Sequence, residues 1–168
     1  MKPYLSVIIP AYNEAKRLPL TLIDIDRHLS KAEFSYEIIV VDNNSTDATR
    51  EIVRRFSHLI KNLRLLECKA PGKGGAVKKG ILEAKGEIRI FMDADNSTSI
   101  DQFRNMKPYF SAKGGSAAGG NEEYDIVIGS RDVKGAQLIP PQPWYKRLVS
   151  NAGNLFIQAL LLPGIWDT

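Results

Sequence analysis

The sequence contains one cysteine, Cys68, and two histidines among its 168 residues. A single thiol excludes a disulfide framework and a zinc site built from cysteines, and it is typical of a reducing compartment. His28 and His58 fall on helical patterns, where we expect solvated side chains rather than metal ligands. The chain therefore shows no pattern of a zinc enzyme or of a small disulfide-stapled protein.

Long hydrophobic runs are also missing. No stretch approaches the roughly 20 apolar residues that a membrane-spanning helix needs. The nearest, residues 155–162, is interrupted by Gln158 and is followed by Pro163 and Gly164. The apolar run at residues 4–9 is too short for the core of a signal peptide. We expect a chain that is soluble or bound peripherally to a membrane.

Charge of neither sign dominates. The chain has 23 Lys and Arg against 19 Asp and Glu, a net charge of +4. The basic residues are dispersed without an aromatic stacking face, which argues against binding of nucleic acid. Hydrophobic residues make up 43% and charged residues 25%, proportions that exclude a disordered or fibrous chain.

Short apolar runs alternate with segments of helical periodicity. The runs are rich in β-branched residues and have the length of buried parallel strands. They lie at residues 5–9, 37–41, 63–66, 88–92 and 126–128. Strand–helix–strand repetition predicts crossover connections and a mostly parallel sheet flanked by helices, which is an α/β fold.

Three helices are expected between these strands. The first starts near Pro19 and places Leu22, Ile25 and Leu29 on one face. The second is capped by Ser45 or Thr46, has Asp47 in its first turn, and aligns Ile52, Val53, Phe56 and Ile60. The third spans about residues 75–85, and its inward residues are Ala76, Val77, Ile81 and Leu82.

The pattern changes after residue 110. Residues 111–120 contain four glycines and predict a flexible loop within one domain rather than a domain boundary. Prolines at 140, 141 and 143 precede a final amphipathic helix, expected at about residues 144–162. Its apolar stripe fits either packing on the sheet or contact with a membrane surface.

Ligands of parallel sheets gather outside the carboxyl ends of the strands. The segment after the first strand, Pro10 to Glu14, offers a proline, an aromatic and a carboxylate, which suit a base and ribose pocket or an ordinary turn. After the second strand, Asp42 is suited to the edge of a nucleobase, whereas Ser45 and Asp47 read as capping residues.

A glycine-rich segment at residues 71–80 precedes the third helix. Its backbone N–H groups and Lys73 suit an anionic phosphate. Gly74 stands where a Walker A loop needs Ser or Thr, and Val77 where a dinucleotide fingerprint needs its third glycine. Both of those nucleotide-binding loops are therefore excluded.

The sharpest pattern is Asp93-Ala94-Asp95, directly after an apolar strand. In extended backbone, residues two apart point the same way, so both carboxylates could hold one Mg²⁺ or Mn²⁺ ion. The same spacing at Asp24 and Asp26 falls on a helix, where the two side chains diverge.

Together these stretches resemble the inverting GT-A glycosyltransferases of family two, and most of all their dolichyl-phosphate glucosyl- and mannosyltransferase branch. The matching pieces are SVIIPAYNE (6–14) with RLP (17–19), EIIVVD (37–42), GKGGAV (72–77), MDAD (92–95), IGSR (128–131) and GIWDT (164–168). Asn43 and Asn44 depart from the Asp-Asp or Asp-Gly pairs that are common after the base-contacting aspartate.

The resemblance implies roles for particular residues. It places Pro10, Ala11, Tyr12, Glu14 and Asp42 at the nucleotide, with Lys73 and Ala94 close by, and Asp93 and Asp95 on the metal. It implies that Arg131 lies near the phosphates of donor or acceptor, and that Arg147 and the final helix lie near the membrane. Asp167 becomes a candidate for activating the acceptor phosphate, alongside Asp95 and Arg131 as catalytic residues.

The expected activity is metal-dependent, inverting transfer of a hexose from a nucleotide-sugar to polyprenyl or dolichyl phosphate at the cytoplasmic face of a membrane. UDP-glucose is favoured and GDP-mannose is the alternative donor. The resemblance also implies a single GT-A catalytic domain, residues 1–168, truncated at its C-terminus. Transfer to a soluble or cell-wall saccharide, and a non-catalytic nucleotide-sugar-binding module, are the competing interpretations.

Overall fold

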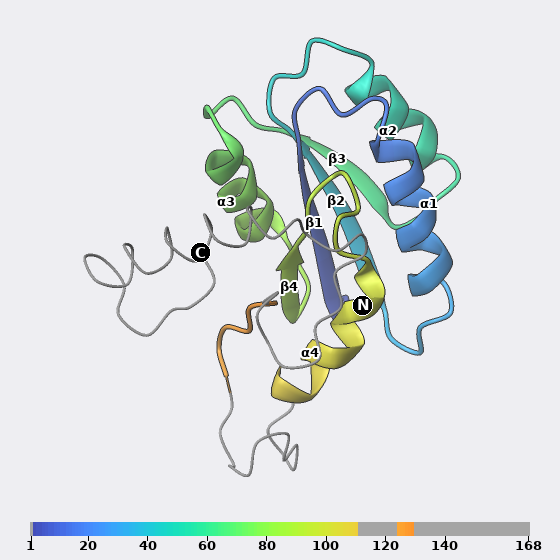
Figure 1. Cartoon of the computed structure of the whole chain (residues 1–168), viewed down its shortest axis with the longest axis vertical. Helices are drawn as coiled ribbons and strands as arrows, with labels where there is room; N and C mark the ends of the chain where they lie inside the picture. Colours follow the sequence, from blue (N-terminus) through green and yellow to red (C-terminus); the bar gives the residue numbers. More distant parts are fainter. Residues whose placement is uncertain (1, 111–123, 130–168) are drawn as a thin grey trace, which may run out of the picture. The chain divides into compact units, whose positions relative to one another are not determined.

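Four parallel strands form the sheet within the described part of the chain, in the order β3-β2-β1-β4 (Figure 1). The computed structural model describes residues 2–110 and 124–129. The strands are β1 (Leu5–Ala11), β2 (Tyr36–Asp42), β3 (Leu63–Glu67) and β4 (Ile88–Phe91). They agree with the first four predicted strands to within two residues, and the predicted parallel α/β fold is confirmed.

The chain divides into two compact units, residues 1–111 and 112–168, and the first unit contains all of the described helices and strands. The predicted glycine-rich loop (111–120), the final amphipathic helix (144–162), Arg131, Arg147 and Asp167 lie outside the described residues. No helix in the described ranges is long and apolar enough to span a membrane.

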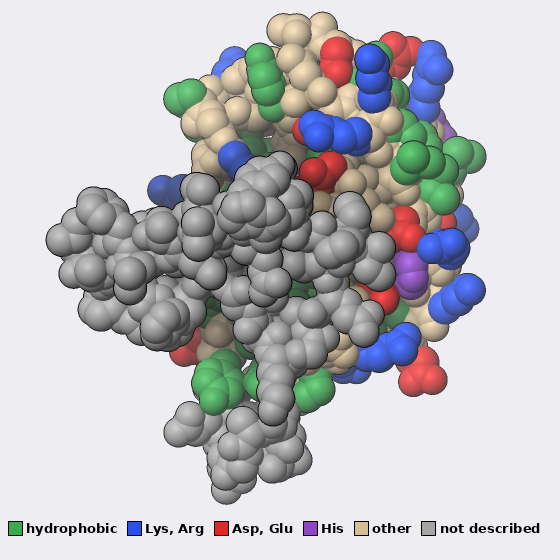
Figure 2. All heavy atoms as spheres, in the orientation of Figure 1, with side chains coloured by type: hydrophobic (Ala, Val, Ile, Leu, Met, Phe, Trp, Pro, Cys, Tyr) green, Lys and Arg blue, Asp and Glu red, His purple; other side chains and the backbone are tan. Residues whose placement is uncertain are grey.

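Helices cover both faces of the sheet (Figure 1). The first face packs against α1 (Leu18–Leu29) and α2 (Thr49–Ser57), and the second packs against α3 (Lys73–Glu83). Because side chains alternate along a strand, Val7 and Ile9 of β1 join the first core and Ile8 joins the second. On the coloured part of the surface in Figure 2, acidic and basic side chains are interspersed, as the balanced composition predicts.

Helix α1 has the predicted apolar face, since Leu22, Ile25 and Leu29 are buried. Helix α3 differs from its prediction, because it starts at Lys73 and buries Ala76 and Gly80. Leu82, which we expected to face inward, is 71% exposed, so that prediction is wrong. A Cβ atom on Gly80 would lie 2.3 Å from Ile8 Cγ2, so α3 approaches the sheet through the glycine and turns Leu82 outward.

Of the residues predicted to cap the second helix, Ser45 and Thr46 do not, whereas Asp47 accepts a hydrogen bond from the first helical residue. Helix α2 begins at Thr49, and Asp47 Oδ1 accepts the hydrogen bond from the Thr49 N–H at 2.9 Å. Ser45 Oγ instead accepts from the Asn13 N–H, and the Thr46 N–H donates to Asn13 Oδ1. Local capping preference is outweighed here by hydrogen bonds that tie the loop after β2 to the loop after β1.

Residues 126–128 form no strand in the structure, and Ile126 and Ile128 are 77% and 72% exposed. A three-residue apolar run has β propensity, but a strand also needs a hydrogen-bonded neighbour, which propensity does not supply. A short 3-10 helix, η1 (Ile100–Gln102), and helix α4 (Phe103–Phe110) follow β4 and were not predicted.

A buried carboxylate, Glu37, links neighbouring strands by hydrogen bonds near their amino-terminal ends. It accepts hydrogen bonds from Ser6 Oγ at 2.6 Å, from the Lys85 N–H at 2.6 Å and from Arg64 Nε at 3.1 Å. Burial opposes its ionisation, but these bonds and the Arg64 charge outweigh burial and lower the pKa of Glu37. This polar cluster lies near the amino-terminal ends of the strands. The carboxyl ends, where parallel sheets bind ligands, are on the opposite side.

Candidate functional site

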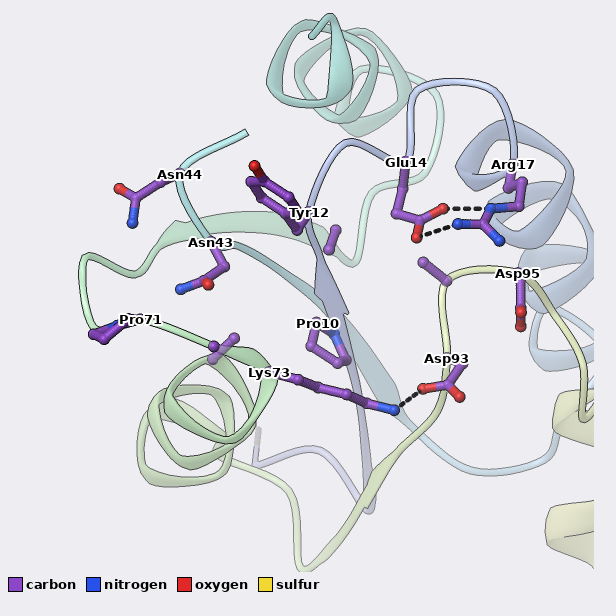
Figure 3. A pocket seen from close by; sticks show the side chains of 14 residues that line it. Pro10, Tyr12, Glu14, Arg17, Asn43, Asn44, Pro71, Lys73, Asp93 and Asp95 are labelled. Atoms are coloured by element: carbon purple, nitrogen blue, oxygen red, sulfur yellow. Dashed lines mark hydrogen bonds and ion pairs between the residues drawn. The ribbon is translucent and has the colours of Figure 1, made fainter. Parts of the chain in front are cut away.

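A cavity of about 700 Å³ lies at the carboxyl ends of the strands, where the sheet meets the start of α3 (Figure 3). The parallel register pairs Ala11 with Asp42, so β1 and β2 end level with each other and their loops meet. Its volume suits a nucleotide-sized ligand. The lining residues are Pro10, Ala11, Tyr12, Glu14, Arg17, Asn43, Asn44, Pro71, Gly72, Lys73, Ala76, Asp93, Ala94 and Asp95.

Eight predicted site residues therefore come together from three segments of the sequence. They are Pro10, Ala11, Tyr12, Glu14, Lys73, Asp93, Ala94 and Asp95. Asp42 lies directly beside the lining residue Asn43, whereas Arg131 and Asp167 lie outside the described residues. Side chains that are more than 60 positions apart in the sequence share one cavity because each follows the end of a parallel strand or starts a helix.

Glu14 and Arg17 form a two-pronged ion pair on one wall of the cavity (Figure 3). Arg17 Nε lies 2.6 Å from Glu14 Oε2, and Arg17 Nη2 lies 2.7 Å from Glu14 Oε1. The hydrogen bond to Glu14 raises the pKa of Arg17. The sequence motifs indicate no role for Arg17, although its position three residues after Glu14 suits an ion pair between the two side chains.

Asp42 is buried, with a relative exposure of 1%. Its Oδ2 accepts a hydrogen bond from the Ser45 N–H at 3.3 Å and lies 3.7 Å from Arg50 Nε. Its Oδ1 has no hydrogen-bond partner among the described residues. A buried carboxylate oxygen without a partner is costly, and this one belongs to the residue directly before the lining residue Asn43.

The loop after β2 also contributes two amides that the sequence analysis did not place in the site. Asn43 is held by hydrogen bonds from its Nδ2 to Ala70 O at 2.5 Å and to Cys68 O at 3.2 Å. Asn44 is exposed and has a φ of 61°. Asparagine tolerates this left-handed conformation, which supplies a local reason for an asparagine after Asn43.

The start of α3 brings backbone and positive charge to the cavity. Gly72 precedes the helix with φ at 84°, a conformation that favours glycine. Lys73 follows it, and its Nζ lies 2.5 Å from Asp93 Oδ1. A helix start with a lysine attracts anions, so this wall suits a phosphate.

Asp93 and Asp95 lie in a turn after β4, not in the extended backbone assumed from the sequence. The two carboxylates nevertheless line the same cavity. The Ser97 N–H donates to Asp95 Oδ1 at 3.0 Å. This bond, together with the Ser97 hydroxyl and the charge of Arg17, lowers the pKa of Asp95, so the carboxylate is ionised at neutral pH.

The donor set fits a cation that binds together with a phosphate. In residues 2–110 and 124–129, no group of three or more His, Cys, Asp or Glu could hold a metal ion. Mg²⁺ is commonly held by one or two carboxylates plus substrate phosphates and water, and carboxylate oxygens suit Mn²⁺ as well. Asp93 and Asp95 match this arrangement and do not match a site built from protein ligands alone.

The sequence is similar to a described family over most of its length, since the model of Glycosyl transferase family 2 matches residues 6–147. The chain belongs to glycosyl transferase family 2. The cavity of this family 2 chain is formed by residues within the matched range.

Curated relatives agree with the family assignment. The chain is 36% identical over 174 residues to a dolichyl-phosphate beta-glucosyltransferase of Dictyostelium discoideum, covering 98% of this chain and 51% of the relative. It is 30% identical to the human protein of the same name, with 98% and 52% covered. A dolichol-phosphate mannosyltransferase of Pyrococcus furiosus is 35% identical, with 96% and 42% covered. The chain spans about half the length of the curated relatives it matches.

Solved structures support the fold. S. aureus TarS has a TM-score of 0.52 at 28% identity, covering 64% of this chain and 19% of that one. Mannosyl-3-phosphoglycerate synthase from Rubrobacter xylanophilus has a TM-score of 0.50 at 21% identity, covering 60% and 33%. The family 2 chain has the GT-A fold that the resemblance implied.

Proposed function

We propose that this family 2 chain belongs to an enzyme that transfers glucose from UDP-glucose to dolichyl or another polyprenyl phosphate. The observation that carries the proposal is one cavity that combines an exposed aromatic ring, a cationic helix start and a pair of carboxylates. These groups match the base, the diphosphate and its counter-ion in a nucleotide-sugar. The names of the relatives from Dictyostelium discoideum and human favour glucose and dolichyl phosphate, and the Pyrococcus furiosus relative keeps GDP-mannose as the alternative donor.

The nucleoside would occupy the wall formed by the loops after β1 and β2. Tyr12 is 59% exposed and presents an aromatic surface for a base. Asp42 Oδ1 would accept a hydrogen bond from an N–H on the edge of that base, which would satisfy the oxygen. Asn43 and Asn44 line the same wall and would face the ribose.

The diphosphate would lie between the start of α3 and the loop after β4. Lys73 would bind a phosphate oxygen, and Asp93 and Asp95 would hold Mg²⁺ or Mn²⁺ against the diphosphate. When bound, such a cation neutralises charge on the departing nucleoside diphosphate. Hydrogen bonds from Ser97, with a smaller effect of the Arg17 charge, lower the pKa of Asp95, which favours the ionised form that a cation needs as a ligand.

The acceptor phosphate would attack the anomeric carbon in line with the leaving group, which inverts its configuration. The family resemblance assigns Arg131 to the phosphates and Asp167 to activation of the acceptor. Arg147 and the segment at 144–162 would lie near a membrane surface, at its cytoplasmic face. Residues 1–168 would belong to a single catalytic domain.

The test is transfer of labelled sugar into a lipid-extractable product. Protein would be incubated with Mn²⁺, dolichyl phosphate and either UDP-glucose or GDP-mannose, and the lipid product counted. We expect a glucolipid from UDP-glucose and little or no product from GDP-mannose. Transfer to a soluble saccharide but not to dolichyl phosphate would overturn the acceptor assignment, and donor binding without transfer or donor hydrolysis would favour a non-catalytic module.

A further inference from the structure

Helix α1 is attached to the loop that carries Asp93 and Asp95. This helix supplies one lining residue of the cavity, Arg17, at its amino-terminal end. The next two turns of α1 form side-chain hydrogen bonds to the loop after β4, over 70 residues away in the sequence. The helix therefore contacts the candidate metal loop through side chains that do not line the cavity.

The first attachment is a buried hydrogen bond from Thr21 Oγ1 to Ala94 O, with a length of 2.7 Å. Thr21 is 1% exposed and Ala94 is 4% exposed. Ala94 stands between the two carboxylates in the sequence, so fixing its carbonyl group fixes the peptide planes on which Asp93 and Asp95 depend. A buried carbonyl that lost this donor would remain unsatisfied, which gives the bond energetic weight.

The second attachment is Asp24, one turn further along the helix. Its Oδ2 accepts hydrogen bonds from Asn96 Nδ2 and from Ser99 Oγ, both at 3.1 Å. Asn96 directly follows Asp95 and has a φ of 55°, so Asp24 restrains the turn by which the chain leaves the second carboxylate. Arg27 Nη2 lies 2.7 Å from Asp24 Oδ1 and balances its charge.

Asp24 is ionised under ordinary conditions. Burial opposes its ionisation, but the hydrogen bonds from Asn96 and Ser99, with the charges of His28 and Arg27, outweigh burial and lower the pKa of Asp24. An ionised carboxylate is an acceptor only, which suits the two donors on the loop.

We propose that Thr21 and Asp24 are positioning residues that hold Asp93 and Asp95 in the geometry needed to bind a divalent cation with a nucleoside diphosphate. The inference rests on the proposed function, because it takes Asp93 and Asp95 as the cation ligands. Removal of residues that hold metal ligands in place by hydrogen bonds commonly changes metal affinity by about 10- to 100-fold. Asp24 has the same spacing to Asp26 as Asp93 has to Asp95, yet it acts on the metal loop as a support and not as a ligand.

The helix offers matched variants for a test. Thr21→Val keeps the shape of the side chain and removes its hydroxyl, whereas Thr21→Ser keeps the hydroxyl. Asp24→Ala removes the second attachment, and Asp26→Ala is its control on the same helix, since the charge of Asp26 acts on Tyr36. Calorimetric titration of Mn²⁺ into each protein with saturating UDP gives the cation affinity, and thermal unfolding gives stability.

We expect Thr21→Val and Asp24→Ala to weaken Mn²⁺ binding by roughly 10- to 100-fold. Thr21→Ser should retain affinity near that of wild type, and Asp26→Ala should be unchanged. Equal Mn²⁺ affinity in Thr21→Val, Asp24→Ala and Asp26→Ala would overturn the inference while leaving the proposed function intact. A loss that follows the fall in Tm across all four variants would also overturn it, since that pattern is purely structural. Absence of Mn²⁺-dependent UDP binding in the wild type would overturn the proposed function itself.

Discussion

Lys73 Nζ lies 2.5 Å from Asp93 Oδ1, so the first residue of α3 is paired with the first carboxylate of the candidate metal loop (Figure 3). The side chains are 58% and 47% exposed. Exposed ion pairs contribute little to stability, typically about 0–1 kcal/mol. The pair is therefore better explained by what the two groups do for a ligand than by its effect on folding.

Replacing Lys73 tests this explanation. Lys73→Ala should weaken UDP binding by roughly 10- to 100-fold, since a hydrogen bond to a charged group contributes about 1.5–3 kcal/mol. Lys78→Ala is the control, because Lys78 is exposed on the same helix and does not line the cavity. Both variants should unfold at nearly the wild-type Tm. If the two variants bound UDP equally well in calorimetry, Lys73 would have no role at the diphosphate.

Replacement of Asp42 should lower the affinity for UDP without a large change in the free energy of unfolding. Asp42→Asn keeps the size of the side chain but removes the charge and one acceptor oxygen. We expect UDP affinity to fall roughly tenfold or more, as for a lost charged hydrogen bond. The free energy of unfolding should stay within about 1 kcal/mol of wild type, because the unpaired buried oxygen contributes no bond to the fold.

The control for Asp42 is Asp47→Ala, in the same loop. Asp47 accepts hydrogen bonds from the Thr49 N–H at the start of α2 and from the Ala15 N–H in the loop after β1, so its loss should reduce stability by about 1 kcal/mol and change UDP affinity less than Asp42→Asn does. Chemical denaturation and calorimetry on the two variants would show the opposite patterns. Unchanged UDP binding in Asp42→Asn would remove Asp42 from the nucleotide site.

The lowered pKa of Glu37 predicts how the free energy of unfolding depends on pH. Its pKa is lower in the folded chain than the ordinary value of 4.5. Its contribution is therefore fully present above that value and is lost as the pH falls through the lower, folded pKa. Denaturation between pH 3 and 7 should show a loss of stability below about pH 4.5 in wild type. The loss should be smaller in Glu37→Gln and unchanged in Glu33→Gln, which alters an exposed glutamate. Identical acid profiles for wild type and Glu37→Gln would contradict this assignment.

Much of the fold follows from local pattern. Apolar runs at 5–9 and 37–41 become the two central strands, and the residues after them reach the cavity because parallel strands end at one edge. The helical face of Leu22, Ile25 and Leu29 is similarly determined by spacing alone. Such features depend on periodicity along the chain, which a sequence displays directly.

The predictions that were wrong concern residues whose placement depends on contacts with residues far apart in the sequence. Ser45 and Thr46 are residue types that commonly cap helices, but here they form hydrogen bonds with Asn13 in the loop after β1. Leu82 follows the helical period inward, but Gly80 permits the closest approach to Ile8 and turns the helix accordingly.

The candidate site shows the same limit. The sequence indicates only that Asp24 lies on a helix, because its bonds to Asn96 and Ser99 depend on how α1 packs beside the loop. The position of Arg17 close to both Glu14 and Asp95 is likewise shown only by the structure. Motif spacing identifies the groups that face a ligand, whereas the groups that support them emerge from packing.

The most direct test is calorimetric titration of UDP-glucose and GDP-mannose, each with and without Mn²⁺, into wild type and Asp95→Asn. Asparagine at this position keeps an acceptor for the Ser97 N–H, so the turn should survive while the charged ligand is lost. We predict that wild type binds UDP-glucose more tightly than GDP-mannose and only with Mn²⁺, and that Asp95→Asn loses the metal-dependent binding. Equal binding with and without Mn²⁺, or no binding of either donor, would contradict the account of a metal-dependent nucleotide-sugar site.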